Sequence, residues 1–247
     1  MSLTVGVMKA YWWTGVPNFG DALAPLLIGH FSGIETVWSP ISQASLVSIG
    51  SILEHLPMKW EGFILGSGRL KENSNLDLSH AAILGLRGPL SARGVYGDFA
   101  LGDPGILANE LVGPQSKLYD LGILPHWRDT ELVGRFTKLI RPPSTIKIIN
   151  PRHDPIEVVK QIGSCRRIVT SSLHGMIVAD AFGIPRRVEI SPSLDNEGGD
   201  FKFRDYSASI NTPLEPGKMV QPSIRLIEDI KFEVFDAFEA LASISEA

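Results

Sequence analysis

The chain has little cysteine and no long apolar run, and each absence excludes a class of protein. Cys165 is the single cysteine among 247 residues, so an internal disulfide and a zinc site built from several cysteines are both excluded. No stretch is long and apolar enough to cross a bilayer, and the sequence after Met1 lacks the basic segment and apolar stretch of a secretion signal. We therefore expect a cytoplasmic protein.

An excess of positive charge is also missing. The formal net charge is −4, and residues 222–247 account for it with six acidic side chains against two basic ones. There is no lysine-rich arm, fixed-period repeat or low-complexity tract, so we expect no nucleic-acid partner. The content of 44% hydrophobic and 20% charged residues is that of an ordinary globular protein with one large or two small domains.

Short apolar runs alternate with segments of helical periodicity, which predicts an α/β fold. A last helix, from about residue 224, repeats apolar residues every three or four positions and has an acidic opposite face; it is expected to pack back on the first half. The other helices are expected at residues 22–31, shortly after Arg87, and at residues 131–140, 156–162 and 173–182. Strands are expected at residues 3–8, 35–38, 45–49, 62–65, 81–86, 118–124, 145–149, 168–170 and 187–190.

One histidine stands where a buried strand passes into a helix. Residues 168–170 are β-branched, Ser172 is suited to be the helix N-cap, and Gly183 is suited to end the helix. His174 then lies in the first helical turn, where backbone N–H groups bind anions and disfavour an imidazolium. We expect its ring to be neutral in an empty site and protonated beside a bound polyanion. A capping or core role for His174 is the alternative.

Polar side chains also end other predicted strands. His126 and Asn150 follow the two strands before the His174 strand, and this convergence predicts a cleft at the carboxyl edge of the sheet. Arg87 leaves a buried strand, where it either forms a surface ion pair or holds a carboxylate or phosphate at two points. Lys202 and Arg204 offer two cations near the cleft mouth.

The loop after the first strand is the candidate wall opposite His174. It contains the aromatic cluster Tyr11, Trp12 and Trp13 and then Asn18-Phe-Gly-Asp21, directly before a helix. Asp21 is either a helix cap or a substrate ligand. The aromatic cluster belongs either to the core or to a surface on which a sugar ring stacks.

Taken together, these motifs resemble the polysaccharide pyruvyl transferase family, with the succinoglycan-type exopolysaccharide branch as the nearest. No single motif is specific, but their order along most of the chain matches that of the family. The motifs are Asn18-Phe-Gly-Asp21, Gly66-Ser-Gly68, Leu86-Arg87-Gly-Pro, Gly102-Asp-Pro104, Leu124-Pro-His126, Ser171-Ser-Leu-His-Gly175 followed by Ala179-Asp-Ala-Phe-Gly-Ile-Pro185, and Lys202-Phe-Arg-Asp205.

The resemblance implies a GT-B-like fold, in which two Rossmann-like halves face each other across a cleft. Residues 1–113 would form the acceptor side, residues 114–221 the donor side, and residues 222–247 the C-terminal helix. The implied reaction moves the enolpyruvyl group of phosphoenolpyruvate onto a sugar of an exopolysaccharide or cell-surface glycan and forms a pyruvate ketal. It would need no metal and no cofactor besides phosphoenolpyruvate as co-substrate.

The resemblance also assigns roles. The family's histidine matches His174 and would be the general acid, and the arginine of the first-half motif matches Arg87. Many relatives have an arginine where this chain has Ser172, so Lys202 or Arg204 would have to supply part of the positive charge that binds the donor anion. The expected site has catalytic residues His174 and Asp21, donor-binding residues Arg87, Ser171, Ser172, Gly175, Lys202 and Arg204, and acceptor-binding residues Asn18, Gly20 and His126.

The sequence leaves open where the protein works and which of several functions it has. A lipid-linked acceptor would bring the protein to the inner membrane face, with peripheral association through exposed aromatic residues such as Trp127 or Trp60. The function itself has two alternatives, a nucleotide-sugar-dependent GT-B glycosyltransferase and a non-catalytic carbohydrate-binding relative. Ser172 and the short chain favour the non-catalytic alternative.

Overall fold

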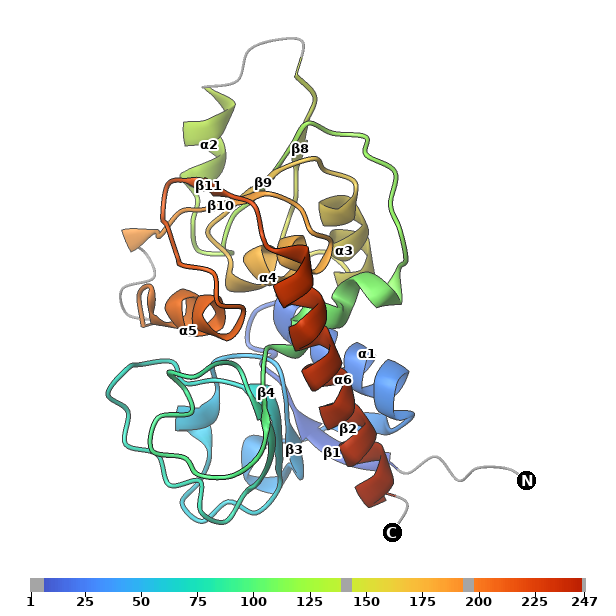
Figure 1. The fold of residues 1–247 in the computed structure, drawn as a ribbon, viewed down its shortest axis with the longest axis vertical. Helices are drawn as coiled ribbons and strands as arrows, with labels where there is room; N and C mark the ends of the chain where they lie inside the picture. The colour runs from blue at the N-terminus through green and yellow to red at the C-terminus, as the bar shows by residue number, and fades with distance from the viewer. Residues whose placement is uncertain (1–6, 139–143, 193–197, 246–247) are drawn as a thin grey trace, which may run out of the picture.

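Two mainly parallel sheets, one in each half of the chain, form the framework of the protein (Figure 1). The computed structural model describes residues 7–138, 144–192 and 198–245. The first sheet has the order β2-β1-β3-β4-β5-β6 and is parallel throughout. Its strands are β1 (Val7–Tyr11), β2 (Glu35–Trp38), β3 (Leu46–Val47), β4 (Phe63–Ser67), β5 (Ala82–Leu86) and β6 (Ala100–Leu101).

The second sheet has the order β11-β10-β9-β7-β8, and only the edge strand β11 runs antiparallel to its neighbour. Its strands are β7 (Leu121–Leu124), β8 (Ile146–Ile148), β9 (Ile168–Thr170), β10 (Arg186–Val188) and β11 (Met219–Val220). Both sheets therefore follow the doubly wound order 2-1-3-4-5 when strands are counted within each half, and the first adds a sixth strand. The strand order reverses between β1 and β3 in one half and between β7 and β9 in the other.

The helices are distributed unevenly between the halves. The α-helices are α1 (Phe19–Ser32), α2 (Leu132–Thr137), α3 (Pro155–Gly163), α4 (Leu173–Ala181), α5 (Phe201–Ser209) and α6 (Ile224–Ser245), and the 3-10 helices are η1 (Ile41–Gln43), η2 (Leu53–His55) and η3 (Pro104–Leu111). Among the described residues, α1 is the one α-helix between strands of the first sheet. The short helix expected after Arg87 is wrong, because residues 89–94 form turns.

The C-terminal helix α6 runs from the second half down along the first, as predicted (Figure 1). It packs against α1, β6 and η3. Phe238 stacks near Phe31 of α1 with ring centroids 5.4 Å apart. A side chain at Gly102, just after β6, would collide with Val234 and Ile230, so this glycine lets α6 approach the sheet. The helix, which follows β11 of the second half, therefore packs on the first half.

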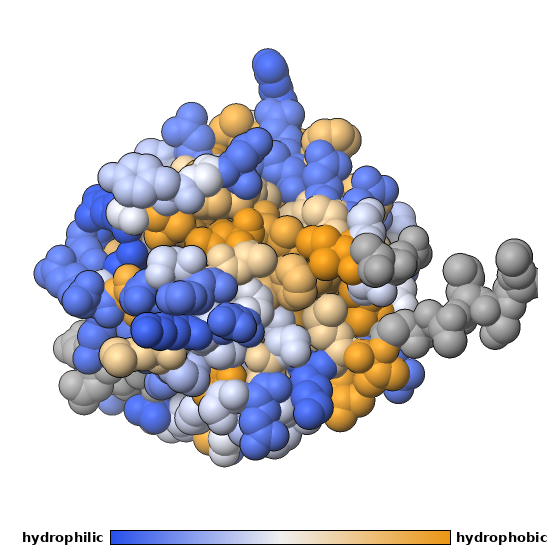
Figure 2. Space-filling model, turned by 90° about the horizontal axis from the view of Figure 1, so that it is seen from below, coloured by the Kyte–Doolittle hydropathy of each residue, from blue (hydrophilic) through white to orange (hydrophobic). Residues whose placement is uncertain are grey.

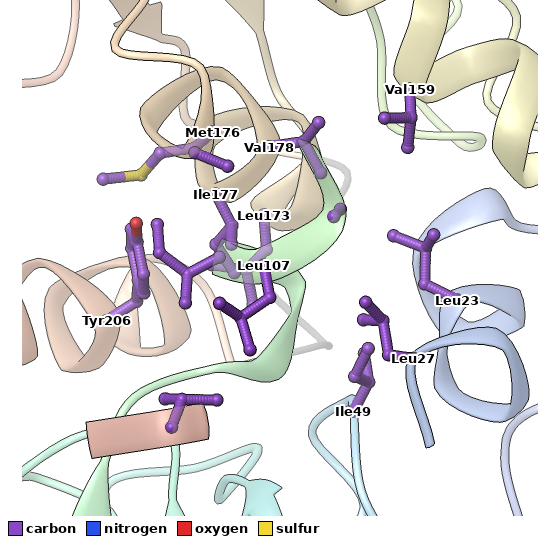
Figure 3. Packing of buried hydrophobic residues seen from close by; sticks show 14 of the residues in the cluster. Leu23, Leu27, Ile49, Leu107, Val159, Leu173, Met176, Ile177, Val178 and Tyr206 are labelled. Atoms are coloured by element: carbon purple, nitrogen blue, oxygen red, sulfur yellow. The ribbon is translucent and has the colours of Figure 1, made fainter. Parts of the chain in front are cut away.

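One hydrophobic core continues through both halves. It includes Leu46 and Leu65 in the first sheet and Ile168 and Val188 in the second. Figure 3 shows how side chains of α1, η3 and α4 meet between the sheets; those labelled include Leu23, Leu27, Leu107, Leu173, Ile177 and Val178. Because close-packed side chains leave little room for sliding, this shared core fixes the position of one half relative to the other.

The helix that carries His174 was predicted correctly. Helix α4 begins at Leu173, and the Ser172 Oγ accepts a hydrogen bond from the Gly175 N–H at 3.4 Å. Gly183 follows the helix with φ of 64°, a left-handed conformation that glycine adopts without strain. Local capping chemistry therefore places His174 in the first turn.

The start of α1 differs from the prediction by three residues. The helix begins at Phe19, and the Asn18 Oδ1 accepts the N–H of Gly20. Asp21 therefore lies in the first turn and is not the cap. Strand β11 was not predicted. Residues 3–6, 139–140 and 193–197, which belong to an expected strand, an expected helix and an expected loop, lie outside the described residues.

The surface has apolar as well as polar areas. Figure 2, which shows the molecule from below, has hydrophobic residues gathered across the middle of that face and hydrophilic residues around them. Exposed large hydrophobic side chains of β2 and α6 include Trp38, Phe232 and Phe235. In the part of the chain that the structure describes, no helix is long and apolar enough to cross a membrane.

Candidate functional site

A cavity of about 220 Å³ lies where four loops meet, namely those after β1, β3, β7 and β9. These four strands flank the two points at which strand order reverses, which is where doubly wound sheets bind ligands. The topology therefore selects this cavity over a larger hollow of about 610 Å³ in the first half, lined by loop residues 74–79 and 93–99. The cavity is lined by Trp13, Asn18, Asp21, Gly50, Ser51, Ile52, His55 and Leu70 of the first half and by His126, Trp127, Arg128, Ser172, Leu173, His174 and Lys202 of the second.

His174 lies in the cavity wall at the start of α4, and its residue exposure is 6%. Burial first, and then the neighbouring Lys202, Arg87 and His126, lower the pKa of its imidazole to about 3. This direction agrees with the neutral ring expected in an empty site, but its largest cause is burial and not the helix N-terminus on which the prediction rested. A bound anion would act in the opposite direction.

The ring of His174 is held between the two halves of the protein. On one side lies Gly20 of α1, where an added Cβ would overlap the His174 Nδ1 and Cγ atoms. Phe19 meets the ring edge-on with centroids 6.4 Å apart. Gly20 was predicted to bind the acceptor; in the structure its lack of a side chain makes room for the imidazole.

Asp103 lies beyond the other nitrogen of the ring, and sequence reasoning did not include it in the site. Its Oδ2 is 3.8 Å from the His174 Nε2, and its side chain is completely buried. Its Oδ1 accepts the N–H of Gly105 and so caps η3. Burial raises the pKa of the Asp103 carboxyl to about 7. The sequence marked this residue only as part of the Gly102-Asp-Pro104 motif, which gives no indication of contact with the histidine.

Cationic and imidazole groups make up the second-half wall. Lys202, in α5, is 7% exposed and lowers the pKa of both histidines in the wall. Burial is the first cause of the low pKa of His126, which is about 3. Arg128 lies over the Trp127 ring at 4.5 Å from its centroid. Because both imidazoles are neutral, the positive charge of this wall comes from Lys202 and Arg128.

The first-half wall carries a carboxylate and an exposed aromatic ring. The Asn18 Nδ2 donates a hydrogen bond to Asp21 Oδ2 at 2.7 Å. Gly50 has φ of 112°, and a Cβ there would lie 3.1 Å from Asp21 Oδ1. Trp13 is 42% exposed. The predicted acceptor residues Asn18 and His126 thus line the same cavity as Asp21 and His174.

Arg87 lies behind the cavity wall. It is fully buried, and its Nε donates a hydrogen bond to Asp205 Oδ2 at 2.9 Å, so the surface ion pair considered above is wrong. Its other nitrogens donate to Ser51 Oγ and to the Arg69 carbonyl. Asp205 also accepts the N–H groups of Leu90 and Ser91. This network joins α5 of the second half to the turns after β5 in the first.

The remaining predicted donor residues fall into two groups. Ser171 and Gly175 support the wall: Ser171 Oγ accepts the N–H of His126 at 2.9 Å, and Gly175 bonds to Ser172. Arg204 points away from the cavity and pairs with Glu72 and Asp200. Residues two apart on a helix face different directions, so α5 directs Lys202 into the cavity and Arg204 elsewhere.

Within residues 7–138, 144–192 and 198–245, no group of three or more His, Cys, Asp or Glu side chains is arranged to hold a metal ion.

Comparisons with known proteins place this site in a family context. The succinoglycan biosynthesis protein ExoV of Rhizobium meliloti (strain 1021) is 29% identical over 225 residues, which cover 86% of this chain and 68% of ExoV. The uncharacterized protein L143 of Acanthamoeba polyphaga mimivirus is 32% identical over 109 residues, covering 43% of this chain and 38% of L143.

Among solved structures, the S. aureus MnaA-UDP co-structure superposes with a TM-score of 0.50 at 10% identity, covering 96% of this chain and 90% of that one. That likeness supports the two-lobed GT-B-like fold. The sequence model of the polysaccharide pyruvyl transferase family matches residues 62–188, slightly more than half of the chain, and this region includes Asp103, His126 and His174. The chain therefore belongs to the polysaccharide pyruvyl transferase family.

Proposed function

We propose that this protein transfers the enolpyruvyl group of phosphoenolpyruvate to a sugar of an exopolysaccharide or cell-surface glycan and closes it into a pyruvate ketal. The observation that carries the proposal is the position of His174, which lines a cationic cavity at the head of α4. Membership of the family supports pyruvyl transfer. The name of ExoV, a succinoglycan biosynthesis protein, supports an exopolysaccharide as the acceptor.

The second-half wall suits the donor. Phosphoenolpyruvate carries a phosphate and a carboxylate, and Lys202 together with the N-terminus of α4 offers positive charge to both. A cavity of about 220 Å³ is below the roughly 300–1,000 Å³ of sites for drug-sized ligands, which favours a three-carbon donor. The donor's negative charge would raise the pKa of His174 from its empty-site value of about 3.

The chemistry begins with a proton transfer. His174 gives its proton to the methylene carbon of phosphoenolpyruvate, and C2 becomes an oxocarbenium centre. A sugar hydroxyl adds to C2 and releases its proton, for which Asp21 in the opposite wall is the proposed acceptor. Inorganic phosphate then leaves with the C2–O bonding pair; a second hydroxyl of the same sugar adds to C2 and closes the ketal, and its proton goes to the departing phosphate. General acid catalysis of this kind contributes about 10²–10⁴-fold.

The open side of the cavity suits the acceptor. Trp13 from the first half and Trp127 from the second both line it. Aromatic faces pack well against the apolar faces of sugar rings, so these side chains are proposed to hold the acceptor over the bound donor.

The test is phosphate release from phosphoenolpyruvate in the presence of galactose- or glucose-terminated oligosaccharides. We expect His174→Gln to abolish turnover but to keep thermal stabilisation by phosphoenolpyruvate, whereas His30→Gln, at an exposed position of α1, should behave as wild type. A near-normal rate for His174→Gln would contradict the assignment. Stabilisation by UDP- or GDP-sugars without stabilisation by phosphoenolpyruvate would favour a glycosyltransferase instead.

A further inference from the structure

Two buried polar atoms face each other beside the cavity, and neither has a hydrogen-bond partner. They are the Asp103 Oδ2 and the His174 Nε2, which lie 3.8 Å apart on side chains that are 0% and 7% exposed. Native proteins rarely leave buried polar atoms unpaired, and such groups need an explanation. Here each atom is the natural partner of the other, because a carboxylate oxygen accepts from an imidazole N–H.

The surrounding structure prevents either group from turning away. Asp103 is fixed by the bond from the Gly105 N–H to its Oδ1, which leaves Oδ2 directed at the ring. At the other edge of the ring, Gly20 has no side chain, and this leaves space beside Nδ1. A movement of about 1 Å would bring Nε2 and Oδ2 within the usual hydrogen-bond distance. The packing of α4, which carries His174, on η3, which Asp103 caps, keeps the two side chains side by side.

We propose that Asp103 is a positioning residue that binds the Nε2–H of His174 and so makes Nδ1 the nitrogen that delivers the proton. This inference rests on the proposed function. In the reactive state the imidazolium carries a proton on each nitrogen. The Nδ1–H bond breaks as the new C–H bond forms on the phosphoenolpyruvate methylene. The other proton stays on Nε2, hydrogen-bonded to the Asp103 carboxylate. The ring is left neutral and regains its proton from the solvent.

The charges around the pair agree with this role. The groups that act on its titration are Lys202, Arg87, His126, Asp21 and Asp205. Burial raises the pKa of Asp103 to about 7 and lowers that of His174 to about 3, so below neutral pH the empty pair holds one proton, on the carboxyl. A bound anion would draw that proton onto the ring. This arrangement of carboxylate and histidine is the same in principle as the orienting pair of a hydrolase triad.

Asp103→Asn is the discriminating variant. Its Oδ1 still accepts the Gly105 N–H, and its amide would then donate to Nε2 and force the Nδ1–H tautomer. We expect kcat to fall on the order of 10²-fold, with little change in the KM for phosphoenolpyruvate. The descending limb of the pH profile of kcat/KM should move to lower pH. Asp154→Asn, which changes an exposed N-cap aspartate of α3, is the matched control and should leave these values unchanged.

A second measurement needs no turnover. The ring-nitrogen NMR shifts of His174 should indicate the Nε2–H tautomer in the wild-type protein near pH 8 and the Nδ1–H tautomer in Asp103→Asn. An Nδ1–H tautomer in the wild type would overturn the inference even if the variant fails to fold. A normal rate and pH profile for Asp103→Asn beside an inactive His174→Gln would overturn it as well. Absence of phosphate release from wild-type protein would contradict the proposed function, while the tautomer would still test the pair.

Discussion

Replacing Gly20 by alanine tests whether the His174 ring is packed against α1. The added Cβ would overlap the imidazole and approach the His174 Cβ to 2.7 Å, so the ring, α1 or both must move. Gly29 lies in the same helix, and a Cβ there meets only the Ile34 carbonyl at 3.8 Å, an ordinary contact. The two substitutions are chemically identical and differ only in what surrounds them.

The magnitudes follow from this difference. Overpacking of a well-packed site costs about 1–3 kcal/mol. The change from glycine to alanine inside a helix otherwise stabilises by up to about 1 kcal/mol. We therefore expect Gly20→Ala to lower the free energy of unfolding and Gly29→Ala to raise it slightly, with roughly 2 kcal/mol between them. For a chain of this size that corresponds to about 4–8 °C in Tm.

Activity should separate the two variants further. A misplacement of about 1 Å at a reacting group can reduce the rate by about 10²-fold, so Gly20→Ala should lose phosphate release from phosphoenolpyruvate while Gly29→Ala retains it. Thermal unfolding and the release assay measure both effects. Equal stability and equal activity of the two variants would refute the packing of His174 on α1.

Three further predictions concern buried groups outside the first turn of α1. Asp205→Asn should lower the free energy of unfolding by about 3–5 kcal/mol in denaturant titrations, because it leaves the buried Arg87 charge uncompensated. Glu72→Gln, at the surface, is the control and should have no measurable effect. Equal results for the two variants would show that the buried pair does not stabilise the contact between the halves. The pKa of the Asp103 carboxyl is about 7 in the folded state, against a reference value of 3.8, so between pH 4 and pH 7 the folded protein binds more protons than the unfolded chain. The contribution of Asp103 to stability is therefore present below pH 4 and is lost as the pH rises to about 7. The Tm of Asp103→Asn minus that of wild type should therefore increase over this interval, and a flat difference would contradict the raised pKa. Burial raises the pKa of the Cys165 thiol to about 11, so iodoacetamide at pH 8 should modify this thiol only after denaturant is added. Mass spectrometry would detect the modification. Rapid labelling of the native protein would show instead that the thiol is accessible.

The sequence alone determined the local features of this protein. Ser172 and Gly183 set the limits of α4 because a cap acts on backbone groups within three residues, and the spacing of apolar residues predicted α6 because the helical period is a property of the segment itself. The alternation of strands and helices predicted the α/β class, and of the polar residues expected to converge at strand ends, His126 and His174 line the cavity and Asn150 does not. These predictions needed only neighbours along the chain.

The partners of the buried polar groups were decided by the tertiary structure. Arg87 and Asp205 are 118 positions apart, and nothing in either segment indicates the other. Asp103 has the sequence context of a helix cap, and Gly20 that of a loop glycine, yet both adjoin the His174 ring. Residue type and spacing show which groups a chain can bury, but which of them meet depends on how the two sheets and their shared core pack together, because that packing brings distant segments within a few ångströms.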